Sequence, residues 1–174
     1  MKKIYIVLTY TGTILSKLVK AYTKKEFSHV SISLDEGLKE MYSFGRLNPY
    51  LIVPAGFVNE HVDSGTFKRF DPIKTKIYSL DVSDEQYDRL KTLIEEFKDK
   101  QLKFDFNIIG LFTAAFRVKL PRRRHLYCAE FVKYLLDHSN IDTNLPVCVR
   151  PDDFQHLENT SPVYYGILKD YSNS

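Results

Sequence analysis

The stretch that most constrains the fold is residues 126–136, LYCAEFVKYLL, in which apolar residues recur at helical spacing. Four of them follow Cys128 at i+3, i+4, i+7 and i+8, namely Phe131, Val132, Leu135 and Leu136. This spacing predicts an amphipathic helix with the cysteine in its first turn, on the side of the apolar stripe. Such a stripe must pack against another element, so the chain has to build a surface that receives it.

Cys128 has the surroundings that a nucleophile needs. The orphan N–H groups and the positive end of a helix favour the thiolate, and neighbouring side chains hold the sulfur in place. The dipole contributes only about 0.3–1 kcal/mol, whereas one pKa unit corresponds to about 1.36 kcal/mol. A thiol of pKa about 8.5 therefore needs a base or cation from elsewhere in the chain. The alternative is that Cys128 is a small buried hydrophobic residue, since free cysteines are among the most buried residues.

Length and composition predict one globular domain, residues 1–174, that folds without disulfides or a structural metal. The net charge of +3, from 25 basic and 22 acidic residues, gives no reason to expect nucleic acid as a partner. Cys128 and Cys148 lie 20 positions apart and lack the spacing of a disulfide framework or a Cys-x-x-Cys zinc site. We therefore expect free thiols and a cytoplasmic protein with no metal or other cofactor.

The N-terminal sequence MKKIYIVLTYTGTIL has the two lysines and the apolar residues of a signal peptide. Hydroxyl-bearing residues and Gly12 interrupt the apolar run, and no small-x-small cleavage site follows. We interpret residues 4–9 as a buried β-strand, because the run is β-branched and aromatic. No run approaches the roughly 20 apolar residues of a membrane span, so we expect no integral membrane segment.

A second informative stretch, residues 27–44, predicts a β-hairpin. Its apolar members, which alternate with polar residues, are Val30, Ile32 and Leu34. The Asp-Glu-Gly sequence at 35–37 is a turn signal, and residues 38–44 return as the second strand. His29 then lies on the polar side, near the open end of the hairpin.

The rest of the chain mixes strands and helices, which predicts an α+β fold. We expect further strands at 66–70, 76–82 and 163–168, helices at 13–23, 83–100 and 107–116, and a short helix beginning at 151–154. The capping box Ser83-x-x-Gln86 marks the start of the helix at 83–100. Residues 48–63 contain two prolines and a glycine and predict a long loop, and the last six residues are expected to fray.

Nucleophilic cysteine catalysis requires a base within hydrogen-bond reach and a third group that orients the base. Of the five histidines, those in polar segments or at the far end of the cysteine helix are His61, His138 and His156. His29 lies on a predicted strand, which is the rigid placement that a base needs. His125, three residues before Cys128, is the local alternative, in a loop.

The segments SHVSISLDEG and YCAEFVKYLL, with the return strand MYSFG, resemble the NlpC superfamily of papain-fold cysteine hydrolases. The order of the segments is similar to that of the circularly permuted branch, which includes the YiiX/YebB-like and lecithin–retinol acyltransferase-like proteins, because His29 comes 99 residues before Cys128. The resemblance covers residues 4–168. It implies a papain-like fold of permuted topology, with a small antiparallel sheet packed against the cysteine helix, Cys128 as nucleophile and His29 as base.

The resemblance implies that the third polar residue comes from the strand paired with the histidine strand, which leaves two candidates open. A three-residue turn at 35–37 pairs His29 with Ser43, whereas a two-residue turn puts Glu40 on the face of the histidine. The resemblance also places the backbone N–H of Cys128 in an oxyanion hole, as a helix N-terminus permits. Tyr127 is a candidate for lining the substrate site, with a packing role as its alternative.

These features predict a cysteine peptidase or amidase that cleaves an amide or ester through a thioester acyl-enzyme. A peptide, a cell-wall fragment or a lipid are the substrate classes to consider, since the permuted relatives include amidases and acyltransferases. The alternative enzyme is a lipid acyltransferase or thioesterase, with an acyl pocket walled by residues 107–116, by 51–53 and by Phe57. A catalytically silent domain that binds a peptide or lipid is the alternative from a different class of protein.

Overall fold

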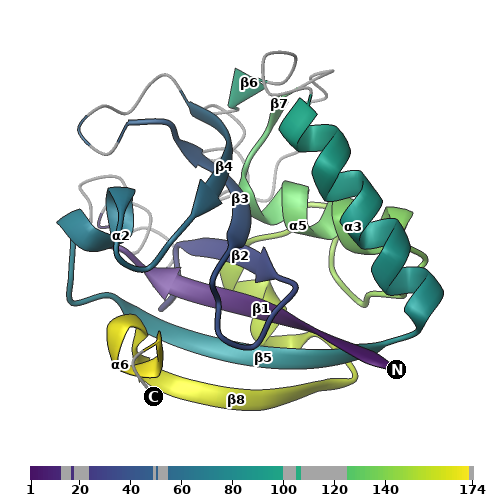
Figure 1. Ribbon diagram of the computed structural model, residues 1–174. Coiled ribbons are helices and arrows are strands. Elements are labelled where there is room, and N and C mark those ends of the chain that lie inside the picture. Colours follow the sequence, from purple (N-terminus) through teal and green to yellow (C-terminus); the bar gives the residue numbers. More distant parts are fainter. Residues whose placement is uncertain are drawn as a thin grey trace.

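One antiparallel sheet of six strands, in the order β4-β3-β2-β1-β5-β8, forms the centre of this α+β protein (Figure 1). The computed structural model describes residues 1–12, 17, 24–48, 50, 55–99, 105–106 and 125–172. The strands of the sheet are β1 (Lys2–Tyr10), β2 (His29–Ser33), β3 (Met41–Arg46), β4 (Ala55–Glu60), β5 (Lys74–Val82) and β8 (Thr160–Ile167). The helices are α2 (Gly65–Arg69), α3 (Asp84–Asp99), α5 (Cys128–His138), the 3-10 helix η1 (Pro151–His156) and α6 (Leu168–Ser172). A short parallel pair, β6 (Asp105–Phe106) and β7 (His125–Leu126), forms a second sheet.

β1 lies in the middle of the sheet and is buried from Ile4 to Thr9. It pairs with β2, with Thr9 opposite His29, and with β5 over its whole length. A strand covered on both faces has a continuous apolar run in place of an alternating one, which is the pattern of this segment. The predicted N-terminal strand is therefore confirmed.

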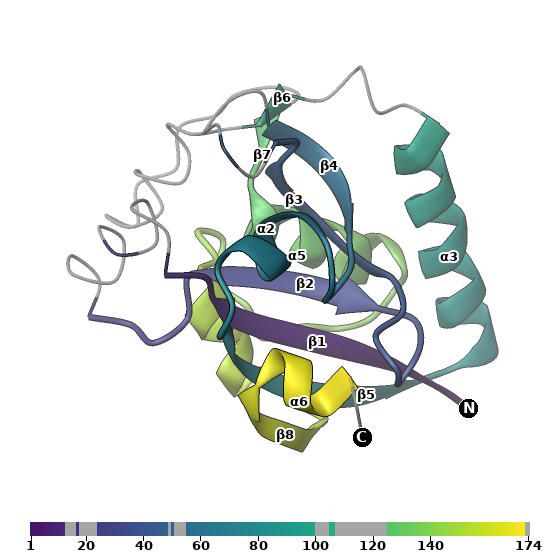
Figure 2. The same cartoon turned by 60° about the vertical axis from the view of Figure 1, so that its left-hand side comes forward.

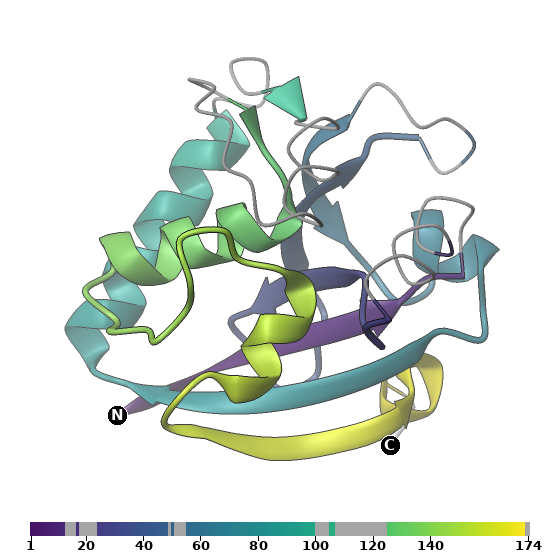
Figure 3. The ribbon, with the colours of Figure 1, turned by 180° about the vertical axis from the view of Figure 1, so that it is seen from behind.

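Each face of the sheet carries its own hydrophobic core. One core lies against α3 and α5 and includes Val30 and Ile32 of β2. The other core lies against α2 and α6. Figure 2 shows α2 and α6 on the near side of the sheet, and Figure 3 shows α5 and η1 from behind. Because successive side chains of a strand point to opposite faces, Ser31 and Ser33 of β2 lie on the α2 side.

Aromatic side chains fix the position of α5 on the sheet. The ring of Phe131 lies 5.1 Å, centroid to centroid, from Phe44 of β3 and from Phe97 of α3. It also lies 5.7 Å from Phe57 of β4. Such pairs contribute about 0.5–1.5 kcal/mol each beyond the burial of their surface. Phe131 is the first residue of the predicted stripe, so the packing that holds it also sets where the first turn of α5 lies.

The segment that we predicted as a long loop, residues 48–63, contains the edge strand β4. All of β4 pairs with β3, from Glu60 opposite Met41 to Ala55 opposite Arg46. A glycine inside a strand indicates a close backbone approach as readily as a loop, and Gly56 lies opposite another glycine, Gly45. The loop prediction was wrong because it gave the prolines and glycine more weight than the ability of residues 57–60, FVNE, to pair with β3 as a strand.

Two short helices replace predicted irregular or extended structure. Residues 66–70, predicted as a strand, belong mostly to α2, in which Phe67 is the one buried side chain. The last six residues do not all fray as predicted, since α6 extends to Ser172. Its first residue, Leu168, is 1% exposed and donates its backbone N–H to the Ile73 carbonyl at 2.9 Å.

Most other elements agree with the sequence. The helices predicted at 83–100 and 126–136 are α3 and α5, the short helix at 151–154 is η1, and the strands at 76–82 and 163–168 are β5 and β8. The capping box is present, because Gln86 Oε1 accepts from the Ser83 N–H and Ser83 Oγ accepts from the Gln86 N–H. The predicted helices at 13–23, apart from Lys17, and at 107–116 lie outside the described residues. Within the described part of the chain, every helix is too short or too polar to cross a bilayer.

Candidate active site

Cys128 is the first residue of α5, and its side chain is 4% exposed. The residue before it, Tyr127, has extended backbone and accepts the first bond of the helix, from the Phe131 N–H at 2.9 Å. The Tyr127 hydroxyl donates to the Val149 carbonyl at 2.7 Å, and burial raises the pKa of this phenol. Tyr127 is therefore an anchor that holds the start of α5, which is the packing role considered for it above.

His29 is the first residue of β2, and its side chain is 15% exposed. Its Nε2 lies 2.9 Å and 3.1 Å from the two carboxylate oxygens of Glu60. The Ser31 hydroxyl donates to the same carboxylate, and its oxygen lies 3.3 Å from His29 Nε2. The ring meets Phe67 edge-on, with the centroids 6.3 Å apart. The imidazole is thus held between β2, β4 and α2.

The side chains of His29 and Cys128 lie close enough to influence each other electrostatically. Burial lowers the pKa of His29, but the Glu60 carboxylate and the side-chain interaction with Cys128 outweigh burial and raise that pKa well above 6.5. This raised pKa favours the imidazolium form of His29. Glu60 occupies Nε2, so a hydrogen bond from the ring to the sulfur would have to use Nδ1.

Neither of the two predicted hairpin registers is present. β2 pairs with β3 with Ile32 opposite Tyr42 and Ser33 opposite Met41, so the connection between the strands is longer than either predicted turn. Ser43 is fully buried and donates its hydroxyl to the Val30 carbonyl at 2.7 Å. The hydrogen bond of Ser43 therefore stabilises the hairpin, and its hydroxyl is not the group that binds the imidazole.

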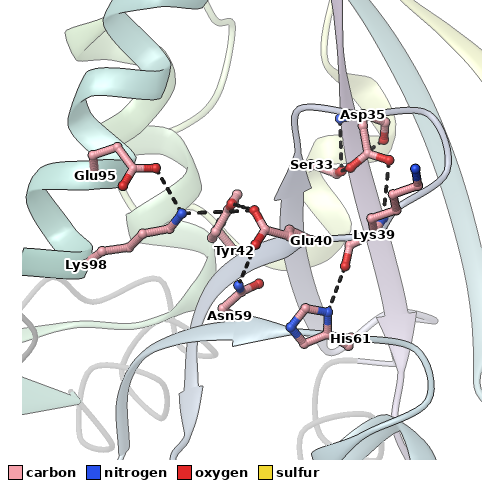
Figure 4. A network of polar contacts seen from close by, with 9 residues as sticks. All are labelled: Ser33, Asp35, Lys39, Glu40, Tyr42, Asn59, His61, Glu95 and Lys98. Atoms are coloured by element: carbon pink, nitrogen blue, oxygen red, sulfur yellow. Dashed lines mark hydrogen bonds and ion pairs between the residues drawn. The ribbon is translucent and has the colours of Figure 1, made fainter.

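Glu40, the other candidate for the third residue, lies in a separate network between β3, β4 and α3 (Figure 4). Its carboxylate accepts from the Tyr42 hydroxyl and from Asn59 Nδ2, at 3.2 Å for the amide. Lys98 of α3 lies 4.0 Å away. These contacts connect the helix to the sheet. They do not involve the imidazole of His29.

Glu60, which binds the imidazole, is the site residue that the sequence alone did not indicate. It is the last residue of β4, and its side chain is 14% exposed. Gly45 of β3 lies beside both partners, since a Cβ placed there would be 3.7 Å from His29 Cε1 and 3.7 Å from Glu60 Oε1. The absence of a side chain larger than a methyl group at this position leaves room for the His29–Glu60 pair. A signal was available in the strand-forming residues Phe57 and Val58, but they lay inside a segment interpreted as a loop.

The remaining histidines are engaged elsewhere or lie apart. His61 is exposed, and its Nδ1 lies 2.7 Å from the Lys39 carbonyl (Figure 4). His138 ends α5 and stacks on Tyr134 with the ring centroids 3.8 Å apart. His156 is exposed in η1. The side chain of His125, the local alternative to His29, lies outside the described residues.

Both cysteines are free thiols, with Cys128 buried and Cys148 half-buried. Among the described residues, no three histidine, cysteine or acidic side chains come together as metal ligands would. No protein-family model matches the sequence, and a search of curated proteins finds no match. The candidate active site is therefore defined by its own geometry: a buried thiol at a helix N-terminus, an imidazole, and a carboxylate that binds the imidazole.

Proposed function

We propose that this protein is a cysteine hydrolase with Cys128 as the nucleophile, His29 as the acid and base, and Glu60 as the residue that orients the imidazole. The observation that carries the proposal is the arrangement of His29, whose Nε2 is bound by Glu60 while the ring interacts with the Cys128 side chain. A thiolate is the reactive form of cysteine, and an adjacent imidazolium stabilises it.

The proposed reaction has two halves. The Cys128 sulfur attacks the substrate carbonyl, a carbon–sulfur bond forms, and the carbonyl electron pair moves to oxygen. When that pair returns, the bond to the amine or alcohol breaks, and the imidazolium of His29 gives its proton to the leaving group. Water then attacks the thioester while His29 accepts a proton from it, the carbon–sulfur bond breaks, and the acid leaves as the Cys128 thiolate and the imidazolium are regenerated. Glu60 keeps the ring in place throughout and stabilises its positive charge.

The helix N-terminus supplies the second element of this mechanism. The first N–H groups of an α-helix have no carbonyl partner within the helix. Preorganised donors of this kind stabilise the oxyanion of a tetrahedral intermediate. We therefore assign the backbone N–H of Cys128 to the oxyanion hole, with Tyr127 holding that first turn in position through its bond to Val149.

We further propose a papain-like fold of permuted topology, in which the histidine strand precedes the cysteine helix. The six-stranded sheet that receives α5 and the order of His29 and Cys128 support this proposal. One feature departs from the resemblance. The carboxylate comes from β4, which is separated from the histidine strand by β3, so Glu60 replaces the residue expected on the neighbouring strand.

Amide hydrolysis fits the described residues better than lipid acyl transfer does. Of the residues predicted to wall an acyl pocket, Phe57 is 3% exposed and packs in the aromatic core with Phe44 and Phe97. The other predicted wall residues, 107–116 and 51–53, lie outside the described residues. Phe57 is therefore not available to contact an acyl chain.

The test is whether an activated acyl substrate leaves its acyl group on Cys128. The protein is mixed with p-nitrophenyl acetate and with aminoacyl p-nitroanilides, and release of p-nitrophenol or p-nitroaniline is followed alongside intact-protein mass spectrometry. We expect an acyl adduct on Cys128 that is absent in Cys128→Ser and decays by hydrolysis. Release without an adduct on Cys128, or equal release by Cys128→Ser, would overturn the proposal.

A further inference from the structure

A pocket of about 130 Å³ lies beside the candidate active site, between the ends of β3 and β4 and the start of α2. Its walls include Arg46, Leu47, Val58, Glu60, Thr66 and Phe67. Two of these residues also touch the imidazole, since Glu60 binds His29 Nε2 and Phe67 contacts the edge of the ring. The pocket is therefore one side chain away from the proposed catalytic base.

One arginine lines this pocket, and the charge of a second arginine acts on it. Arg46 is the last residue of β3 and is half-buried, and Arg69 of α2 holds its guanidinium 3.9 Å above the ring of Tyr50. Burial and the charge of Arg69 lower the pKa of Arg46. Among the described residues, no carboxylate forms an ion pair with either guanidinium. Two neighbouring cations without a counter-charge favour an anion between them or against one of them.

The Glu60 carboxylate in the wall does not supply that counter-charge. Its oxygens accept from His29 and from the Ser31 hydroxyl, so its charge is balanced by the imidazolium. His61, also in the wall, is exposed and has its Nδ1 beside the Lys39 carbonyl. A guanidinium presents a rigid fork of donors that matches the oxygens of a carboxylate or a phosphate. Arg46 can thus bind such a group without displacing the pair that orients His29.

We propose that this pocket binds a carboxylate or phosphate group carried by the substrate, with Arg46 as its main contact and Arg69 as a second positive charge. The inference rests on the proposed function and adds a substrate class to it. The substrate would be an acyl compound with an anionic group that reaches this pocket when its scissile bond lies at Cys128. Leu47 lines the pocket, and Tyr50 lies under the Arg69 guanidinium. Their side chains are 56% and 74% exposed and can contact the apolar part of such a compound.

The experiment uses thiol reagents that carry the anion at increasing distance from the reactive carbon. N-bromoacetyl amino acids with one, two, three and four methylenes before the carboxylate are compared with their neutral primary amides, and with the phosphonate at the best length. In each case the Cys128 sulfur displaces bromide, so that a carbon–sulfur bond forms, a carbon–bromine bond breaks and bromide leaves. Rates at Cys128 are measured by peptide mass spectrometry, with Cys148 as the internal reference.

We expect one chain length at which the anionic reagent reacts about tenfold faster than its amide, the factor of a single charge-assisted hydrogen bond. This preference should disappear in Arg46→Gln, weaken in Arg69→Gln and persist in Arg89→Gln. Arg89 is the matched control, because it lies in α3, paired with Glu85 at 3.2 Å. The better of the carboxylate and the phosphonate then identifies the anionic group that the pocket takes.

Equal rates for acid and amide at every length would overturn the proposal. An equal loss of preference in Arg46→Gln and Arg89→Gln would also overturn it, because the net charge of the protein rather than the pocket would then attract the anionic reagent. If Arg46→Gln does not fold, Arg69→Gln and the loss of the preference in high salt decide the matter. The neutral amides separate the two proposals. If they alkylate Cys128 no faster than Cys148, the proposed function fails. If they prefer Cys128 and the acids show no advantage, only the anion pocket fails.

Discussion

Replacing Glu60 by glutamine is the most direct test of the way in which the site is built. Both carboxylate oxygens lie within 3.1 Å of His29 Nε2, and the side chains are only 15% and 14% exposed. The Glu60 charge is the largest influence that raises the pKa of His29 against the effect of burial. Glutamine has nearly the same shape and keeps one acceptor oxygen, so the substitution removes charge with little change in packing.

The size of the effect follows from the type of hydrogen bond. A bond to a charged group contributes about 1.5–3 kcal/mol, and its neutral counterpart about half as much. Glu60→Gln should therefore destabilise the imidazolium by about 1 kcal/mol or slightly more, since the low exposure of the pair limits solvent screening. Because about 1.4 kcal/mol corresponds to a factor of ten, the equilibrium constant that favours the imidazolium–thiolate pair over the neutral pair falls roughly five- to tenfold.

The assay is the rate of Cys128 alkylation by iodoacetamide between about pH 5 and 9, with both cysteines followed by peptide mass spectrometry. Glu60→Gln should slow the reaction of Cys128 by about five- to tenfold near pH 6.5, the unperturbed pKa of histidine, and leave Cys148 unchanged. Glu40→Gln is the matched control, because it removes a carboxylate from the network of Figure 4. If the profiles of the Glu60→Gln and wild-type proteins coincide while His29→Ala changes the profile, Glu60 does not set the charge state of the imidazole, and the reasoning is refuted.

Three further predictions concern the same site. In the folded protein near pH 6.5, Cys128 should alkylate faster than Cys148, because an imidazolium favours its thiolate; equal labelling in peptide maps would contradict the nucleophile assignment. His29→Ala should slow the alkylation of Cys128 and His125→Ala should leave it nearly unchanged, whereas the reverse pattern in the same assay would identify the local His-x-x-Cys pair as the dyad. Gly45→Ala should keep wild-type reactivity, since its Cβ meets ordinary contact distances, whereas Gly45→Val should displace the His29–Glu60 pair and slow the reaction about as much as Glu60→Gln does.

The cysteine helix and the histidine strand were predictable because each depends on local periodicity. The stripe at i+3, i+4, i+7 and i+8 from Cys128 is buried as the spacing predicts, with Phe131 and Leu135 fully buried. The capping box and the apolar run of β1 are equally local signals. None of these depends on which strand lies next to which, and all of them were found.

Pairing register was not predictable, and the third residue depends on it. One residue of slip exchanges the two faces of a strand, and both predicted turns were too short for the connection between β2 and β3. The segment that supplies Glu60 was assigned to a loop because of its prolines and glycine. The partner of an imidazole is a contact between residues far apart in sequence, 31 positions here, and no local pattern encodes it.

The alternation in β2 posed a conflict that the structure resolves. Val30 and Ile32 pack in the core beneath α5, so His29, by period two, should point away from Cys128. Both residues, however, are the first of their elements, His29 in β2 and Cys128 in α5. A side chain at the end of a strand is not confined to one face of the sheet. The imidazole therefore interacts with Cys128 while its ring meets Phe67 on the α2 side.

The pH dependence of stability gives an independent test of the His29–Glu60 pair. The pKa of His29 is raised above its ordinary value of 6.5 in the folded protein, by the Glu60 charge and by Cys128, against the effect of burial. The pair therefore stabilises the fold fully below about pH 6.5, the unfolded value, and this contribution is lost as the pH rises through the folded pKa. Urea unfolding of the wild type, His29→Gln, Glu60→Gln and the double variant gives the coupling free energy at each pH.

We expect a coupling of about 1.5–3 kcal/mol near pH 6, the contribution of a hydrogen bond to a charged group, falling toward that of a neutral bond at alkaline pH. The control cycle uses Lys2 and Asp88, which pair at 3.1 Å with side chains 42% and 70% exposed. An exposed pair of this kind contributes at most about 1 kcal/mol, and the pair contains no histidine, so its coupling should be small and flat. A His29–Glu60 coupling that is as small and as flat as that of the control, or that grows as the pH rises, would mean that the imidazole is neutral in the folded protein, and the ion-pair mechanism would be lost with it.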